Sequence, residues 1–144
     1  MKMEHLLAII TFIIIAVPTS AENKKSCYDT AKTQMDLNDC AALELKAADD
    51  ELNRAYKEIV KKNGDDKVFL DRLKAAQRTW LTFRDAELEA LFPEADKQIQ
   101  YGSSYPMCYA KWKATVTRER TQQLKKWITG VSEGDICSGS LPVK

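Results

Sequence analysis

The stretch from Ala75 to Glu89, AAQRTWLTFRDAELE, constrains the fold more than any other part of the chain. Read as a helix, it presents one mixed face, with members three and four residues apart: Gln77, Trp80 or Leu81, Arg84 and Leu88. This face combines large apolar groups with an amide and a guanidinium group. Because a buried charge without a partner is costly, such a face has to pack against helices that carry polar groups of their own. We therefore predict that this helix is the central one of an all-α domain.

The first residues have the anatomy of a secretory signal peptide. Lys2 gives a positive start, a largely apolar run extends from Leu6 to Val17, and small residues follow up to Ala21. The apolar run is too short to span a bilayer, which disfavours the alternative of an uncleaved anchor. We predict a signal peptide over residues 1–21 and a mature domain over residues 22–144. The mature protein is expected to be periplasmic or secreted, with no stable membrane insertion.

Charge and histidine content argue against several classes of protein. The 22 Lys and Arg residues nearly balance 21 Asp and Glu residues, and the resulting net charge of +1 argues against nucleic acid as the main partner. The single histidine, His5, lies within the predicted signal peptide. The mature chain then has no imidazole for a Ser-His-Asp or Cys-His site, or for a typical catalytic zinc site. We predict a protein that is not an enzyme and binds no cofactor.

Four cysteines remain in the mature chain: Cys27, Cys40, Cys108 and Cys137. In an exported chain this number predicts two disulfides, with three connectivities open. A metal site is the alternative, but the cysteines lie far apart and none forms a CxxC pair. We therefore predict a disulfide framework that also ties down the C-terminal tail.

Helical periodicity predicts three long helices. A capping-box pattern at Thr33 precedes a first helix that extends to about Lys62, and Asn63-Gly64 ends it. The second helix is expected over about residues 67–91 and the third over about residues 107–128, joined by a link with a Gly-Ser-Ser turn. No strand alternation appears. The predicted fold is an up-down-up three-helix bundle with a disulfide-tied tail.

An antiparallel register brings a set of polar residues from all three helices to one level. With the first turn at Gly64–Asp65, Asn53 falls opposite Gln77, and Asp49 lies within a turn of Arg84. The set comprises Asp49, Asn53, Gln77, Trp80, Arg84, Thr117, Arg120 and Thr121. We interpret it as a structural polar layer that fixes the helix register. The alternative, an active site, is disfavoured because an adjacent arginine makes a carboxylate a poor general base.

One end of the predicted bundle is acidic and carries exposed tyrosines. Its candidate partner-binding residues are Asp85, Glu87, Glu89, Glu94, Asp96, Tyr101 and Tyr105. A row of carboxylates along one helix end and a loop does not provide two facing carboxylates for glycoside hydrolysis. It suits a cationic protein partner, with the tyrosines as anchors, although either tyrosine also suits packing over the bundle end.

Several motifs resemble the LprI-type lysozyme-inhibitor domain family, whose members are small exported bacterial helical proteins, mostly of unknown function. The motifs begin with Cys27…Cys40 and Asp49-x-x-Leu52-Asn53-x-x-Tyr56, continue in AQRTW and FRDAE, and end in TRERT at residues 117–121. The resemblance implies an exported binding protein whose partner is a lysozyme. It identifies no inhibitory residues.

The resemblance also bears on the cysteines. Many members have a cysteine pair where this chain has Leu88 and Trp112, so apolar packing is expected to replace that bridge. The resemblance favours Cys27–Cys40, which leaves Cys108 to pair with Cys137 over a barely reachable distance. Cys40–Cys108 with Cys27–Cys137 is the alternative, and both arrangements stay open here.

These observations predict a non-enzymatic exported binding protein, with lysozyme inhibition in the bacterial cell envelope as the activity that the resemblance implies. The alternative is a structural or stress-related envelope protein that binds another protein or a cell-wall component. The oligomeric state and the type of lysozyme stay open.

Overall fold

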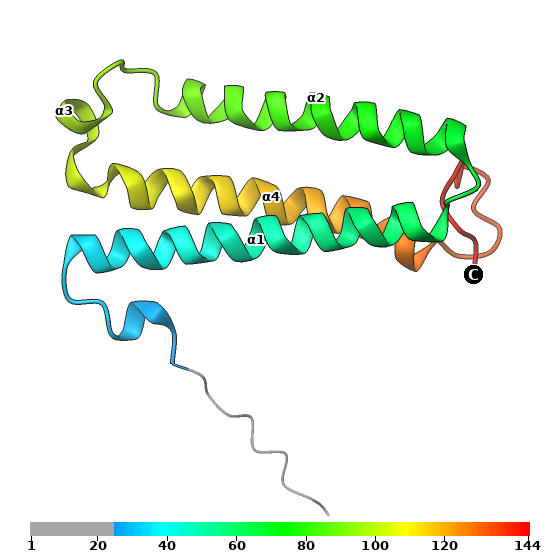
Figure 1. Cartoon of the computed structure of the whole chain (residues 1–144), viewed down its shortest axis with the longest axis horizontal. Coiled ribbons are helices and arrows are strands. Elements are labelled where there is room, and N and C mark those ends of the chain that lie inside the picture. The colour runs from blue at the N-terminus through cyan, green and yellow to red at the C-terminus, as the bar shows by residue number, and fades with distance from the viewer. Residues whose placement is uncertain (1–24) are drawn as a thin grey trace, which may run out of the picture.

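Residues 25–144 are described by a computed structural model (Figure 1), and the predicted signal peptide lies outside this range. The elements, in chain order, are the 3-10 helix η1 (Cys27–Asp29), α1 (Gln34–Lys62), α2 (Lys67–Leu91), α3 (Lys97–Tyr101), the 3-10 helix η2 (Gly102–Ser104) and α4 (Tyr105–Thr129). Among these residues the only β-type pairing is an isolated bridge between Val131 and Val143. The all-α prediction is confirmed.

The long helices begin and end where local signals predict. Thr33 caps α1 by accepting a hydrogen bond from the backbone N–H of Asp36, and Asp66 caps α2 by accepting from that of Phe69. The link between the second and third predicted helices contains more helix than the Gly-Ser-Ser turn expected there. It contains α3 and η2, because Asp96 caps a short helix and Gly102, at a φ of 66°, reverses the chain after it.

The helices α1 and α4 lie side by side along their length and run in the same direction (Figure 1). Alanines line the contact: Ala41, Ala48 and Ala55 on α1, and Ala110 and Ala114 on α4, all at most 7% exposed. Side chains this small let two helix backbones approach closely. The pair is therefore the tightest part of the molecule.

The helix α2 runs opposite to α1 and α4 and lies farther from both (Figure 1). Larger side chains fill the space between it and the pair. The core cluster contains Leu52, Ala55, Ile59, Leu73 and Leu124, with Tyr56, Phe69, Trp80, Trp127 and Ile128 packed against it. This cluster lies toward the α1–α2 turn, and in the other half of α2 the buried side chains are Arg84 and Leu88.

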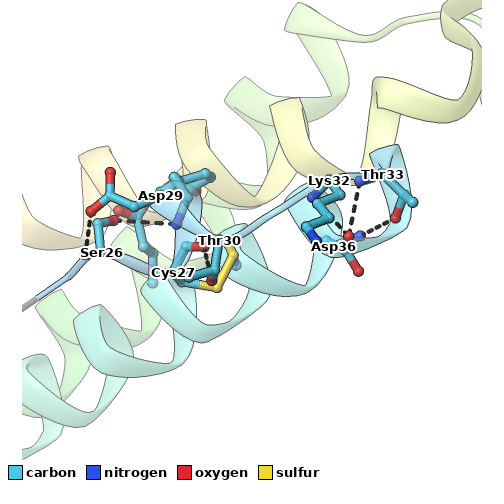
Figure 2. The surroundings of a disulfide bond; sticks show 10 residues. Ser26, Cys27, Asp29, Thr30, Lys32, Thr33 and Asp36 are labelled. Carbon is cyan, nitrogen blue, oxygen red and sulfur yellow. Dashed lines mark hydrogen bonds between the residues drawn. A yellow bond between two sulfur atoms is a disulfide. The ribbon is translucent and has the colours of Figure 1, made fainter.

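A disulfide between Cys27 and Cys40 fastens η1 to α1. Figure 2 shows a capping box on each side of it. The Asp29 carboxylate accepts from the backbone N–H of Ser26 at 2.8 Å, and the Asp36 carboxylate accepts from the N–H groups of Lys32 and Thr33, each at 2.9 Å. The N-terminal segment is thus held by a covalent bond and by satisfied backbone donors.

The predicted second disulfide is wrong, because Cys108 and Cys137 are both free. Cys108 lies in the first turn of α4, and the other end of that 25-residue helix, after which Cys137 follows, is about 30 Å from it. Hydrogen bonds hold the tail instead. The N–H of Val131 donates to the carbonyl of Pro142 at 2.8 Å, and the indole of Trp127 donates to Ser140 at 3.0 Å.

Candidate functional site

Arg84 is the one charged side chain that is buried among the described residues, and it links all three long helices. From α2, its guanidinium donates to Asp49 of α1 at 3.3 Å and to Thr117 of α4 at 3.1 Å. Its Nε also donates to the neighbouring Asp85 at 3.1 Å. The arginine is 8% exposed, but the side chain of Asp49 is 42% exposed. In the Arg84–Asp49 ion pair, the arginine is therefore buried and the aspartate is partly exposed to solvent.

A second polar contact lies beside the first. Arg120 of α4 donates through Nε to Gln77 of α2 at 2.6 Å, and burial lowers the pKa of this guanidinium. The guanidinium carbons of Arg84 and Arg120 lie 5.2 and 5.9 Å from the ring centre of Trp80. Thr121 is fully buried and donates back to the carbonyl of Thr117 at 2.9 Å. The tryptophan is thus held between two cations.

Seven of the eight residues assigned to the polar layer take part in these contacts, and the exception is Asn53. Its side chain is exposed, makes no hydrogen bond within residues 25–144, and faces a hollow between α1 and α2. The Asp49 carboxylate accepts from Arg84, and an adjacent arginine disfavours use of a carboxylate as a general base. The hydrogen bonds of the layer join α2 to both α1 and α4.

The acidic end is partly neutralised by lysines. Lys113 of α4 contacts Asp85 at 3.0 Å, and Lys97 of α3 contacts Glu89 at 3.0 Å. Asp96 is engaged as the cap of α3. The carboxylates of Glu87 and Glu94 have no cationic partner within residues 25–144. Five carboxylates therefore face three cations, namely Lys97, Lys113 and the buried Arg84, and the end of the bundle keeps an excess of negative charge.

Opposing influences act on Asp85. Burial raises the pKa of its carboxyl group, but the hydrogen bonds from Lys113 and Arg84, together with their charges, outweigh burial and leave the pKa below its usual value. Asp85 is thus ionised at neutral pH and committed to these two partners. The same lysine also lies over the ring of Tyr109, 5.5 Å from its centre.

The two tyrosines proposed as exposed anchors are half-buried. Tyr101 and Tyr105 pack edge-on against Phe92, with ring centres 5.3 and 5.2 Å away. Tyr109 completes this aromatic cluster, and burial raises the pKa of Tyr105. Of the two alternatives for these tyrosines, the structure has the one in which they pack over the bundle end.

An apolar hollow opens between α2 and α4, next to the acidic end. We call it the α2–α4 groove; its volume is about 390 Å³ and it is lined by Arg84, Glu87, Leu88, Ala90, Leu91, Trp112 and Val116. Leu88 is buried at 3% exposure, whereas Trp112 is 52% exposed. Both residues thus line the same groove, but only Leu88 is buried. Trp112 projects from a helix at the edge of a hollow.

Sequence patterns alone missed several of these features. Lys113 is not among the predicted site residues, yet it completes the contact with Asp85. Phe92 is likewise not among the predicted site residues, yet it is the centre of the aromatic cluster. Its position directly before Pro93 gave no signal of that role, because the cluster depends on how α3 folds back.

Neither a metal site nor a membrane span appears in the described part of the chain. No group of three or more His, Cys, Asp or Glu side chains within residues 25–144 is placed to hold a metal ion. None of the helices in this range combines the length and the hydropathy that crossing a bilayer requires.

Fold and site together define a small helical protein with a hydrogen-bonded polar centre and with acidic and aromatic residues at one end of the bundle. Residues 26–124 match the family model described as lysozyme inhibitor LprI, so this chain belongs to that family. An uncharacterised protein of Rhizobium meliloti (strain 1021) is 35% identical over 130 residues, covering 83% of this chain and 91% of the relative. No solved structure matches.

Proposed function

We propose that this protein is exported to the bacterial cell envelope and there binds and inhibits lysozyme without acting as an enzyme. The observation that carries the proposal is the match of residues 26–124 to the lysozyme-inhibitor family. The signal-peptide pattern of residues 1–21 supports export. The engagement of Asp49 by Arg84 supports a structural role for the polar centre and leaves the surface as the working part.

The charge of the acidic end supports a cationic partner. Glu87 and Glu94 are exposed and lack ion pairs among the described residues, so their charge is available to a partner. Exposed carboxylates of this kind steer a cationic protein and raise its rate of association, an effect that salt weakens.

Trp112 supplies the apolar part of the proposed surface. Half-exposed tryptophans are frequent energetic centres of protein interfaces, because they bury a large area at little cost in conformational entropy. Trp112 borders the groove that Leu91 and Glu87 also line. An apolar anchor next to unpaired charge matches the arrangement of protein interfaces, with an apolar centre and a polar rim.

The proposal is tested by measuring lysis of bacterial cell walls by lysozymes of several types in the presence of the mature protein. We expect inhibition of at least one type, and weaker inhibition at high salt. The double variant Glu87→Gln, Glu94→Gln should need about tenfold more protein for the same inhibition. Glu133→Gln, in the tail at the other end of the bundle, is the matched control. Undiminished lysis by every type would remove the inhibitor assignment.

A further inference from the structure

A second hollow lies on the opposite side of Arg84, between α1 and α2. We call it the α1–α2 groove; its volume is about 410 Å³. This volume falls within the range of small-molecule sites, roughly 300–1,000 Å³. Its polar lining comes from Asp49, Asn53 and Tyr56 on α1 and from Lys74, Gln77, Arg78 and Arg84 on α2. None of these residues belongs to the acidic end.

The polar groups of this groove have hydrogen-bonding capacity to spare. Within residues 25–144, the side chains of Asn53, Tyr56, Lys74 and Arg78 make no hydrogen bond and no ion pair. Gln77 accepts from Arg120 through Oε1, which leaves both of its amide hydrogens available. Because Asn53, Lys74 and Arg78 are exposed, a ligand rich in hydrogen-bonding groups can reach them.

The charged side chains of the groove favour a ligand with a negative charge. Asp49 is the one carboxylate in its lining, and that carboxylate already accepts from Arg84. Lys74 and Arg78 remain as cations without an acidic partner among the described residues. A ligand that carries a carboxylate would pair with them through charge-assisted hydrogen bonds.

Apolar side chains also line the groove. Leu52 is 5% exposed and Leu81 is 40% exposed, and the half-buried ring of Tyr56 lies beside them. Amides at Asn53 and Gln77 are suited to pair with an amide on the ligand. The ligand thus combines an apolar ring face, hydroxyl and amide groups, and a carboxylate.

We propose that the α1–α2 groove binds an acidic N-acetylated amino sugar of the kind found in bacterial cell-wall glycan. The carboxylate pairs with Lys74 and Arg78, the acetamido group pairs with the amides, and a sugar face packs on Tyr56 and Leu81. This binding is separate from lysozyme inhibition and does not depend on it.

The test is a titration of the isotope-labelled mature protein, followed by NMR, with the disaccharide of N-acetylglucosamine and N-acetylmuramic acid. We expect saturable shifts of the backbone amides of Asn53, Gln77 and Arg78. Two further compounds test the contribution of each part of the ligand to binding: chitobiose lacks the carboxylate, and lactate lacks the sugar. Each should bind at least about tenfold more weakly than the acidic disaccharide.

Variants locate the site. Lys74→Gln and Arg78→Gln should each weaken binding about tenfold. Arg72→Gln should leave it unchanged, because Arg72 lies on α2 outside the groove, beside Val68, Asp71 and Ala75. All three positions are exposed, and unchanged thermal unfolding midpoints will show that the variants are folded. Equal binding of chitobiose or lactate, shifts elsewhere on the protein, or full binding by Arg78→Gln would overturn the proposal.

Discussion

At the scale of single residues, Arg84 determines how the three long helices meet. Its guanidinium bonds to Asp49, Asp85 and Thr117 and lies near the ring of Trp80. An apolar side chain at this position would leave the buried hydroxyl of Thr117 without its donor. The partners are not equivalent, because water reaches the carboxylates of Asp49 and Asp85 but not Thr117.

This difference in exposure predicts that replacing Arg84 destabilises the protein more than replacing its partner Asp49. Arg84→Ala should lower the free energy of unfolding by about 3 kcal/mol, since several charged hydrogen bonds and a cation–π contact are lost together. Asp49→Ala should cost only about 1 kcal/mol, because Arg84 keeps its other partners and the carboxylate is partly solvated. Urea unfolding measures both. Equal losses would contradict the assignment of Arg84 as the common partner.

Several carboxyl groups make stability depend on pH. The backbone N–H groups of Lys32 and Thr33 lower the pKa of Asp36, and the hydrogen bond from Lys125 lowers that of Glu51 despite burial. A carboxyl group whose pKa is depressed by folding contributes stability above its unfolded value, about 3.9 for Asp and 4.3 for Glu. That contribution is lost as the pH falls through the folded pKa.

We therefore expect the urea midpoint of unfolding to be lower at about pH 3 than at about pH 7. The variant Asp36→Asn should show a smaller drop than the wild-type protein, since one of the responsible groups no longer titrates. Lys67→Gln, which removes an exposed charge at the start of α2, serves as a control. An unchanged midpoint between the two pH values would refute this account of acid sensitivity.

At the scale of elements, the molecule consists of a tight helix pair and a more distant third helix. The alanines of α1 and α4 let these two helices approach, whereas α2 is held by the core cluster at one end and by Arg84 farther along. The grooves on both sides of Arg84 follow from this separation.

The close approach of α1 and α4 predicts intolerance of larger side chains. Ala48 is 1% exposed, so Ala48→Leu should reduce the free energy of unfolding by about 1–3 kcal/mol through overpacking. The neighbouring Ala47 is exposed, and Ala47→Leu should change it by less than about 0.5 kcal/mol. Urea unfolding of the two variants compares them directly. Equal stability would show that the pair is not tightly packed.

Sequence predicts the long helices well, because their boundaries depend on local signals such as Thr33, Asp66 and Asn63-Gly64. The sequence also predicts that Arg84 lies near Asp49, because the short turn between the first two helices fixes an antiparallel register. Sequence-based prediction fails where a feature depends on contacts between segments that are far apart in the chain. The folding of α3 back onto Phe92 and the free state of Cys108 depend on tertiary distances that no local pattern encodes.

At the scale of the whole molecule, the two ends of the bundle differ. One end carries α3, the aromatic cluster and the unpaired carboxylates, and the other carries the hydrogen-bonded tail (Figure 1). The exposed Cys137 lies in that tail, far from Cys108 in α4. The proposed partner surface and the tail therefore belong to opposite ends.

The single disulfide predicts the outcome of thiol titration. Denatured, unreduced protein should show two free thiols per chain, from Cys108 and Cys137. In the native protein, Cys137 should react faster because it is exposed and Cys108 is half-buried. Peptide mapping should recover Cys27 joined to Cys40. The absence of free thiols would mean that a second bridge forms.

The central claim is that the acidic end and Trp112 form the surface through which this protein binds lysozyme. Calorimetric titration of the mature protein into lysozyme tests it most directly. We predict saturable binding, weakened at least about tenfold by Trp112→Ala. Leu43→Ala, at an exposed position on α1, should leave it unchanged. Absence of binding, or equal affinity of the wild type and Trp112→Ala, would contradict the claim.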